Sequence, residues 1–308
     1  SILIDKELWN TLSNNGINGV RSNYSWQSHC EKVMQQFSKL LPSRTEAMKK
    51  EAPVQSSPKS PSFGKRLISL NRLMISDIDN TLIGDNKSMR ELFALLESHR
   101  DTLAWGVSTG RSLELTIEAI TEYNIPTPDI IICSVGTEIY YGPDLRMDKG
   151  WQNHISYQWR PEEIKEVLGD IDFLTFQESE GQRSHKISYY MADDYDYLFW
   201  VYYKLEEAGL QCRVIYSHGQ FLDIVPVRAS KGKAIDYLSY KYEFSPLHVM
   251  VAGDSGNDED MLSGKARGLV VGNYSEELEK LKDRPNIYFS PRKYAAGIID
   301  GLNHYGFI

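Results

Sequence analysis

The sequence of 308 residues predicts an α/β protein with a buried parallel sheet and a smaller α+β domain inserted into it. Two observations indicate this fold class. Continuous apolar runs are each followed by a polar loop and a helix-like segment, as in strands buried on both faces of a parallel sheet. Between Trp151 and Val227 the pattern changes to longer helices and alternating strands, which indicates an insertion.

The individual elements follow from hydrophobic periodicity. Helices are predicted at 89–99 and 112–123 after the first two strands, and at 160–168 and 195–208 in the insertion, which also carries the strand HKISYYM (185–191). This gives a core domain of residues 67–150 and 228–308 and a cap domain of residues 151–227. The strands of the parallel sheet are predicted at RLMIS (72–76), LAWGVS (103–108), DIIICSV (129–135) and LHVMVAG (247–253).

The first 66 residues differ from the rest. Residues 1–41 are predicted to form two short helices, with apolar faces at residues 8–12 and 33–41, separated by a break at Asn14-Asn15-Gly16. Residues 42–66 contain four prolines and five serines with little to bury, so they are predicted to be a flexible linker.

Composition limits the classes of function. A formal net charge of −8 argues against nucleic-acid binding, and no apolar run approaches the ~20 residues of a membrane helix. The start lacks a signal peptide's basic and apolar regions, and also an initiator Met, so we expect a cut or processed chain. Cys30, Cys133 and Cys212 form no CxxC pair, which indicates a reduced, cytoplasmic protein, with Cys133 as a small core residue. Scattered histidines give no zinc motif.

Two polar segments follow the first two predicted strands. Asp77 and Asp79, in Asp77-Ile78-Asp79-Asn80-Thr81, come directly after RLMIS. Of two carboxylates at this spacing, one can act as the nucleophile and the other as the general acid and base. Ser108-Thr109-Gly110-Arg111 follows LAWGV, and its hydroxyl and amide groups can hold phosphate oxygens.

Two further segments complete the set. Lys231, in SKGKA at a predicted helix start, offers a point charge for phosphate. Gly253-Asp254-Ser255-Gly256-Asn257-Asp258 follows HVMVA and offers the oxygen ligands that Mg²⁺ prefers. Alone, each segment also fits a helix cap, an ordinary loop, a solvated lysine or an acidic turn. Together, and at the strand ends where such sites form, they indicate phosphoryl transfer.

The motifs DIDNT, STGR, Lys231 and GDSGND resemble those of the haloacid dehalogenase superfamily. The 23-residue step from Lys231 to Asp254 is similar to that of members with a C2-type cap. The resemblance implies a Rossmann-like core in which Asp77 attacks phosphorus and Asp79 moves the proton. It also implies a phosphate held by Thr109, Gly110 and Lys231, and Mg²⁺ held by the Asp77 carboxylate, the Asp79 carbonyl and Asp254, with Asp258 in support; Asn257 and Arg111 belong to the same motifs.

The resemblance narrows to the sucrose-phosphate phosphatase family through SVGTEIYY (134–141), HKISYYM and LDIVPVRASKGKAIDYL (222–238). It implies hydrolysis of sucrose 6-phosphate, with sugar contacts from Gln182 and Lys186 and with Glu138 and Asp223 nearby. Alternation along QRSHKISYY likewise predicts that 182, 184 and 186 share one face, with Ile187 and Tyr189 in the cap's core; a solvated strand face is the alternative.

Residues 6–30 resemble the end of the glycosyltransferase domain of sucrose-phosphate synthases. The resemblance implies that the chain is the C-terminal part of such a synthase, with that domain as its partner; an extra helical pair packed on the phosphatase is the alternative. Two other functions stay open: a non-catalytic regulatory or partner-binding domain, and a phosphatase for another sugar phosphate such as mannosyl-phosphoglycerate. Intact Asp77 and Asp79 favour catalytic activity. The sequence alone does not show which sugar phosphate the cap selects.

Overall fold

The computed structural model describes residues 6–23, 63–217 and 219–308, and the chain divides after Ser60 into two units. In the first unit, α1 is one continuous helix, Lys6–Asn23. The predicted break at Asn14-Asn15-Gly16 is therefore wrong, because one glycine costs a helix interior only about 1 kcal/mol and no proline follows to end it. The predicted second helix at 33–41, Cys30 and the predicted linker up to residue 62 lie outside the described residues.

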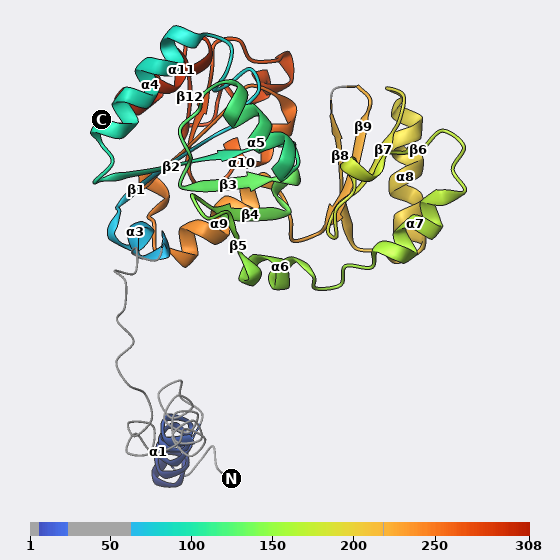
Figure 1. The fold of residues 1–308 in the computed structure, drawn as a ribbon. Coiled ribbons are helices and arrows are strands. Elements are labelled where there is room, and N and C mark those ends of the chain that lie inside the picture. Colours follow the sequence, from blue (N-terminus) through green and yellow to red (C-terminus); the bar gives the residue numbers. More distant parts are fainter. Residues whose placement is uncertain (1–5, 24–62, 218) are drawn as a thin grey trace, which may run out of the picture. The chain divides into compact units, whose positions relative to one another are not determined.

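The second unit is built on an eight-stranded sheet in the order β12-β11-β10-β1-β2-β3-β4-β5 (Figure 1). The strands from β12 to β3 are parallel, whereas β4 and β5 are antiparallel additions at one edge. The four predicted strands correspond to β1, β2, β3 and β10, so the α/β fold class is confirmed. The strands are β1 (Arg72–Ser76), β2 (Leu103–Ser108), β3 (Ile130–Cys133), β4 (Glu138–Tyr141), β5 (Arg146–Met147), β10 (Val249–Gly253), β11 (Arg267–Val270) and β12 (Ile287–Phe289).

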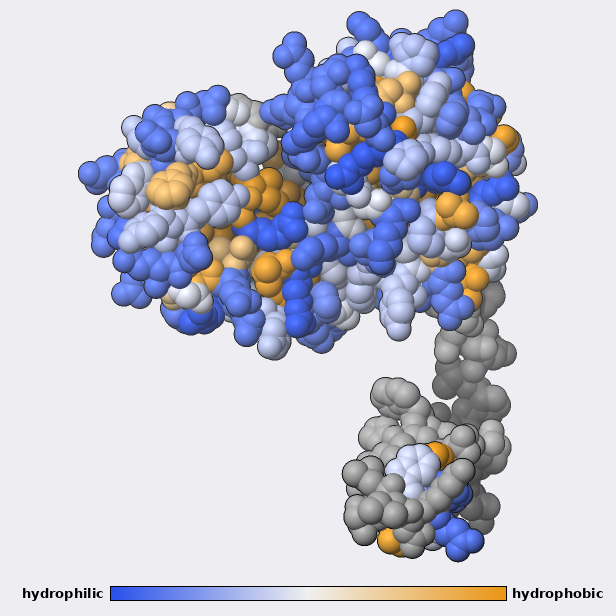
Figure 2. Space-filling view, turned by 180° about the vertical axis from the view of Figure 1, so that it is seen from behind, coloured by the Kyte–Doolittle hydropathy of each residue, from blue (hydrophilic) through white to orange (hydrophobic). Residues whose placement is uncertain are grey.

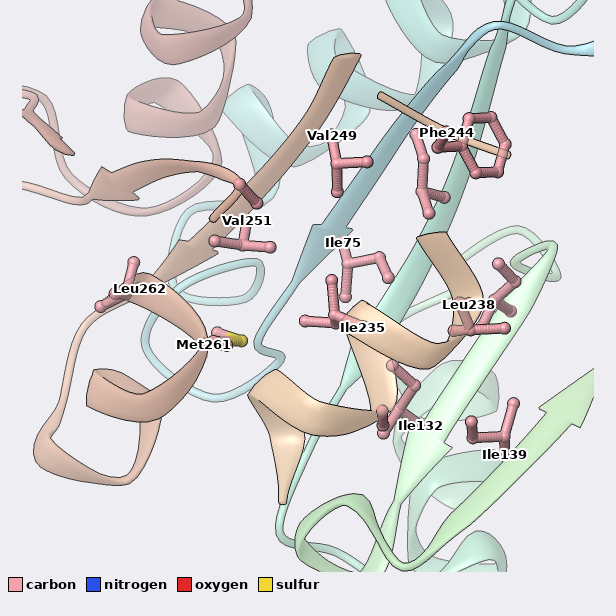
Figure 3. Packing of buried hydrophobic residues seen from close by; sticks show 14 of the residues in the cluster. Ile75, Ile132, Ile139, Ile235, Leu238, Phe244, Val249, Val251, Met261 and Leu262 are labelled. Carbon is pink, nitrogen blue, oxygen red and sulfur yellow. The ribbon is translucent and has the colours of Figure 1, made fainter. Parts of the chain in front are cut away.

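Helices cover both faces of this sheet, and alternate strand residues serve the two faces. Ile75 and Val251 point toward one helical layer (Figure 3), whereas Met74 and Met250 pack in the cluster on the other face. The first layer contains α3 (Phe63–Ser69), α6 (Lys149–Ile155), α9 (Lys231–Lys241) and α10 (Glu259–Leu262). The second contains α4 (Asn86–Ser98), α5 (Leu113–Glu122) and α11 (Tyr294–His304).

Two predicted boundaries differ from the structure. Helix α3 begins at Phe63, within the predicted linker, because its Leu67 and the following Leu70 are buried in the core. Helix α6 lies where the cap domain was predicted to begin, yet its Trp151 and Ile155 are buried in the same core cluster. The elements that belong to the cap therefore start with α7 (Pro161–Gly169).

The cap is an antiparallel sheet in the order β6-β7-β9-β8, with two helices on one face. Ile187 and Tyr189 are buried with those helices, as the alternation predicted. The predicted strand through residue 182 is wrong, because the chain reverses in a tight turn in which Arg183 pairs with Lys186. The elements are β6 (Thr175–Phe176), β7 (Ile187–Tyr190), α8 (Tyr195–Glu207), β8 (Cys212–Ser217) and β9 (Phe221–Pro226).

The surface of the second unit is mostly polar on the face shown in Figure 2, with smaller hydrophobic areas between hydrophilic ones. Among the described residues, no helix combines the length and the apolar character needed to cross a membrane.

Candidate active site

The carboxyl edge of the parallel sheet brings the four sequence motifs together. Asp77 follows β1, and its backbone N–H donates to Ala252 of β10 (2.9 Å). Thr109 follows β2, and its N–H donates to Ile132 of β3 (2.9 Å). Asp254 follows β10 directly. Three of the motifs are thus each placed by a strand of the sheet, and backbone hydrogen bonds extend the sheet into the first two, whereas Lys231 begins helix α9.

Lys231 is the centre of a buried charge cluster. Its Nζ donates to Asp77 Oδ1 (2.7 Å), to Asp258 Oδ1 (2.6 Å) and to Asn257 Oδ1 (3.2 Å). Its side chain is only 1% exposed. Burial lowers the pKa of Lys231, but Asp258 and Asp77 outweigh this and raise it above the ordinary value. The lysine is therefore a fixed positive charge beside the Asp77 carboxylate.

Gly136 allows Lys231 to approach the sheet. Its φ is +88°, and an added Cβ would lie 2.2 Å from the backbone carbon of Ser230 and 2.5 Å from the nitrogen of Lys231. A side chain would therefore push the start of α9 away from β3. The Nε1 of Trp151 holds this loop by donating to the Gly136 carbonyl (3.1 Å).

The acidic groups form a cluster that fits a divalent cation. One oxygen from each of Asp77, Asp254 and Asp258 lies within 4.8 Å of the others. Burial raises the pKa of Asp77 well above its ordinary value and that of Asp254 to about 6, because the charged forms lack solvation. A hard cation with oxygen ligands would supply the missing compensation, so the donor set fits Mg²⁺.

The three carboxylates are not equivalent. Asp258 Oδ1 accepts from Lys231, and its Oδ2 accepts from the N–H groups of Asp254 (3.0 Å) and Ser255 (3.3 Å). Asp254 Oδ1 accepts from Thr81 (2.8 Å). Asp258 is therefore an orienting group that fixes Lys231 and the loop, whereas Asp77 and Asp254 are the better candidates for direct metal ligands.

Asp79 and Arg111 form a second, more exposed pair at the rim of the cluster. The guanidinium donates from Nε to Asp79 Oδ2 (2.8 Å) and from Nη2 to Asp79 Oδ1 (2.7 Å). The Arg111 N–H also donates to the hydroxyl of the buried Thr109 (3.2 Å). Both oxygens of Asp79 are thus engaged by Arg111 in the substrate-free protein.

A cavity of about 310 Å³ lies above these groups, and both the core and the cap line it. From the cap, Lys186 and Asp223 contribute a buried ion pair (3.2 Å) in which Ser188 bridges the two side chains. The core residues around the cavity are Asp77, Asp79, Asn80, Thr109, Gly110, Arg111, Ser112, Leu115, Val135, Asp254, Ser255 and Asn257.

The four residues implied for sugar contacts separate into two pairs. Lys186 and Asp223 line the cavity, whereas Gln182 and Glu138 do not belong to its lining. Gln182 engages its whole amide within the cap: Nε2 donates to the carbonyls of Gln177 and Ser188, and Oε1 accepts from the Ser188 N–H. Glu138 accepts a hydrogen bond from the hydroxyl of Ser134 (3.1 Å).

Sequence reasoning missed several cap residues that line the cavity, among them Gln177 and Glu180. Both lie in the polar stretch between β6 and β7, whose composition does not distinguish it from a solvated loop. Cys133, by contrast, lies buried in the core, where burial raises its pKa, in agreement with the small core residue that the sequence predicted.

Residues 70–306 match the family model described as sucrose-6F-phosphate phosphohydrolase. The chain is 37% identical over 257 residues to sucrose-phosphatase 1 of Nicotiana tabacum, a match covering 78% of this chain and 60% of that protein. It is 32% identical over 242 residues to mannosylfructose-phosphate phosphatase of Agrobacterium fabrum, a match covering 76% of this chain and 97% of that protein.

Among solved structures, the chain is similar to the sucrose-phosphatase from Synechocystis, determined in complex with sucrose and phosphate. The TM-score is 0.72 at 29% identity, and the match covers 77% of this chain and 98% of that one. A haloacid dehalogenase-like hydrolase from Bacillus subtilis, at 20% identity and a TM-score of 0.58, shares the fold. This chain spans 60% of the length of the tobacco protein.

Proposed function

This chain belongs to the sucrose-6F-phosphate phosphohydrolase family, and we propose that it hydrolyses sucrose 6-phosphate to sucrose and phosphate with Mg²⁺ and an aspartyl-phosphate intermediate. The observation that carries the proposal is the position of the Asp77 carboxylate. It lies beside the buried ammonium of Lys231, on the core side of a cavity that the cap also lines.

Asp77 is proposed as the nucleophile. Its Oδ1 is held by Lys231, so its Oδ2 is the oxygen available for attack on phosphorus. The new oxygen–phosphorus bond forms as the bond from phosphorus to the sugar oxygen breaks, which leaves an acyl phosphate on Asp77. Lys231, the Thr109 hydroxyl and the Gly110 N–H would hold the phosphate oxygens, because positioning and charge neutralisation dominate phosphoryl transfer.

The metal would be held by Asp77, the backbone carbonyl of Asp79 and Asp254, with Asp258 in support. When bound, Mg²⁺ supplies positive charge that offsets the repulsion between the carboxylate and the phosphate. The oxygen-only donor set and the raised pKa values of Asp77 and Asp254 support this assignment.

Asp79 is proposed as the general acid and base. It would protonate the departing sugar oxygen and then take a proton from the water that attacks the acyl phosphate. Because Arg111 donates to both oxygens of Asp79, this pair has to open or rearrange before Asp79 acts.

Sugar recognition is proposed for the cap. Lys186 and Asp223 form the polar part of the cap's wall, and both side chains can bond to hydroxyl groups in the cavity. The family resemblance implied that Gln182 contacts the sugar. Its amide is instead bonded to the backbone of Ser188 in β7, so Gln182 would support the sugar site by holding this strand. Glu138 would likewise act from outside the cavity lining.

A second substrate is favoured by one comparison. The chain covers 97% of a mannosylfructose-phosphate phosphatase at 32% identity, so this sugar phosphate is the alternative within the same chemistry. A purely regulatory domain is less well supported, because Lys231 keeps its hydrogen bonds to Asp77 and Asp258 and leaves Oδ2 of Asp77 available for attack.

We also propose that residues 1–41 are the end of a glycosyltransferase domain, which would place this phosphatase in a longer cytoplasmic sucrose-phosphate synthase. The support is the resemblance of residues 6–30. The family match begins only at residue 70 and leaves this segment outside.

Phosphate release from a panel of sugar phosphates, with Mg²⁺ and with EDTA, tests the proposal. We expect the highest kcat/KM for sucrose 6-phosphate, loss of activity in EDTA and recovery with Mg²⁺. The Asp77→Asn variant is expected to lose about 10³-fold or more in kcat, since it lacks the attacking charge. Activity within tenfold of wild type in this variant would exclude Asp77 as the nucleophile, and full activity in EDTA would exclude the metal.

A further inference from the structure

The turn that leads into β7 contacts the core through Arg183 and also through His185, whose Nε2 lies 2.8 Å from the hydroxyl of Ser156 after α6. Within this turn the backbones of Arg183 and Lys186 exchange two hydrogen bonds, at 3.0 and 3.2 Å. The Arg183 guanidinium reaches the core, where Nη2 lies 2.5 Å from the Oε2 of Glu114 on α5. This ion pair therefore joins the cap to the core, as does the pair between Arg213 of β8 and Asp260 of α10 (3.0 Å).

The arginine is already fixed on the cap side. Its Nη1 donates to the carbonyls of Glu180 (3.1 Å) and Gln182 (2.7 Å), and its side chain is 18% exposed. Glu114 is 70% exposed, so it is the only partner that has to be ordered when the pair forms. A guanidinium held in this way loses little conformational freedom on pairing.

The two segments joined by this pair are the ones that surround the cavity. On the cap side, residues 177–186 include the cavity-lining Gln177, Glu180 and Lys186. On the core side, Glu114 lies in the first turn of α5, directly after the loop at 109–112 that lines the cavity, and Leu115 lines it as well. The pair thus links residues 177–186 of the cap to the loop at 109–112 and the first turn of α5 in the core.

We propose that Arg183 is a positioning residue whose ion pair with Glu114 holds residues 177–186 against the phosphate-binding end of the core. An ion pair with an exposed partner adds little to folding stability. Instead, the ion pair changes the equilibrium between arrangements of the cap. When the population of the arrangement that binds substrate changes several-fold, the apparent affinity for substrate changes by the same factor. The identity of the substrate rests on the proposed function, whereas the contact itself does not.

A double-mutant cycle tests the proposal by enzyme kinetics. Arg183→Gln and Glu114→Gln are each expected to raise KM for sucrose 6-phosphate about fivefold at nearly constant kcat. The double variant is expected to match Arg183→Gln, because Glu114 acts through this arginine, whereas Arg183→Gln also removes the hydrogen bonds to the carbonyls of Glu180 and Gln182. Hydrolysis of p-nitrophenyl phosphate, which has no sugar to position, is expected to change less than twofold.

Two controls separate this role from general charge effects. Lys165→Gln removes an ion pair with Glu162 that stays within α7, so it is expected to leave KM unchanged. High salt is expected to raise the wild-type KM toward that of the variants, because the pair is partly exposed to screening. Independent, additive effects of the two substitutions on KM would overturn the proposal.

Amide hydrogen exchange, measured without substrate, tests the contact between Arg183 and Glu114 independently of activity. Glu114→Gln, a change in the core, is expected to speed exchange of the cap residues 177–186 several-fold, and Arg183→Gln is expected to speed it by at least as much, since it also removes two hydrogen bonds within the cap. The double variant is expected to show no further increase. Unchanged exchange in Glu114→Gln would overturn the proposal. If instead the wild type hydrolyses no sugar phosphate, the proposed function fails and exchange alone decides about the ion pair.

Discussion

Removing the charge of Lys231 is expected to destabilise the fold as well as the chemistry. The ammonium compensates Asp77 and Asp258, at 2.7 and 2.6 Å, in a place where its own side chain is 1% exposed. Lys231→Met keeps the length of the side chain but leaves two buried carboxylates facing each other. Breaking one partner of a buried ion pair costs about 3–5 kcal/mol, because the remaining charge is neither solvated nor paired.

The size of this loss depends on pH. Burial already raises the folded-state pKa of Asp77 above its unfolded value, and loss of Lys231 raises it further. A raised carboxyl pKa means that the folded state binds the proton more tightly, so stability falls as pH rises from the unfolded pKa toward the folded one. The deficit of Lys231→Met is therefore expected to be small near pH 5 and to approach its full size of about 3–5 kcal/mol near pH 8.

Urea denaturation between pH 5 and pH 8, in EDTA, measures this deficit. Lys87→Met is the matched control, because Lys87 is an exposed residue whose ion pair with Glu91 is 4.0 Å long, and its loss is expected to stay within about 0.5 kcal/mol. The reasoning is refuted if Lys231→Met loses no more than the control, or if its deficit does not grow with pH.

Three further predictions follow from the same site. In metal-free wild type, the raised pKa of Asp254, about 6, is expected to lower stability as pH rises from 4 to 6, by up to about 3 kcal/mol, and Mg²⁺ is expected to reverse this in urea titrations. Lys186→Ala is expected to lower kcat/KM at least tenfold for sucrose 6-phosphate but not for p-nitrophenyl phosphate; an equal fall for both would contradict a sugar-binding role. Gly136→Ala is expected to cost about 1–3 kcal/mol and much of the activity, since its methyl group meets Ser230; a fully active, stable variant, judged by thermal melting and phosphate release, would disprove this.

The parallel sheet and the polar groups at its carboxyl edge were predictable because both depend on local patterns. A buried parallel strand is a continuous apolar run, and the polar residues that follow it reach the same edge of the sheet. The sequence order of Asp77, Thr109 and Asp254 after their strands therefore predicted that they meet. Only the structure shows that Asp258 orients Lys231, since this depends on the path of a 3₁₀ turn, η5 (Gly256–Asp258).

The cap was less predictable, because alternation cannot tell a continuous strand from a reversal. Residues 182–186 fit the spacing of a strand, but the turn at Arg183 places the side chain of Gln182 against backbone groups. The contact of Arg183 with Glu114 spans 69 residues, and no local pattern marks it. At the N-terminus, Asn14-Asn15-Gly16 carried a turn signal that the helix α1 overrides.

The double hydrogen bond from Arg111 to Asp79 links the resting enzyme to the chemistry of the leaving group. An alkoxide leaves only with a proton, whereas a nitrophenolate leaves without one. If Asp79 is the acid, as proposed, formation of the acyl phosphate from alkyl esters waits for this ion pair to open, and its formation from activated aryl esters does not, whereas the later attack of water needs Asp79 in both cases. The ratio of the two rates then reports how often Asp79 is released, and a weaker pair would favour natural sugar esters over artificial ones.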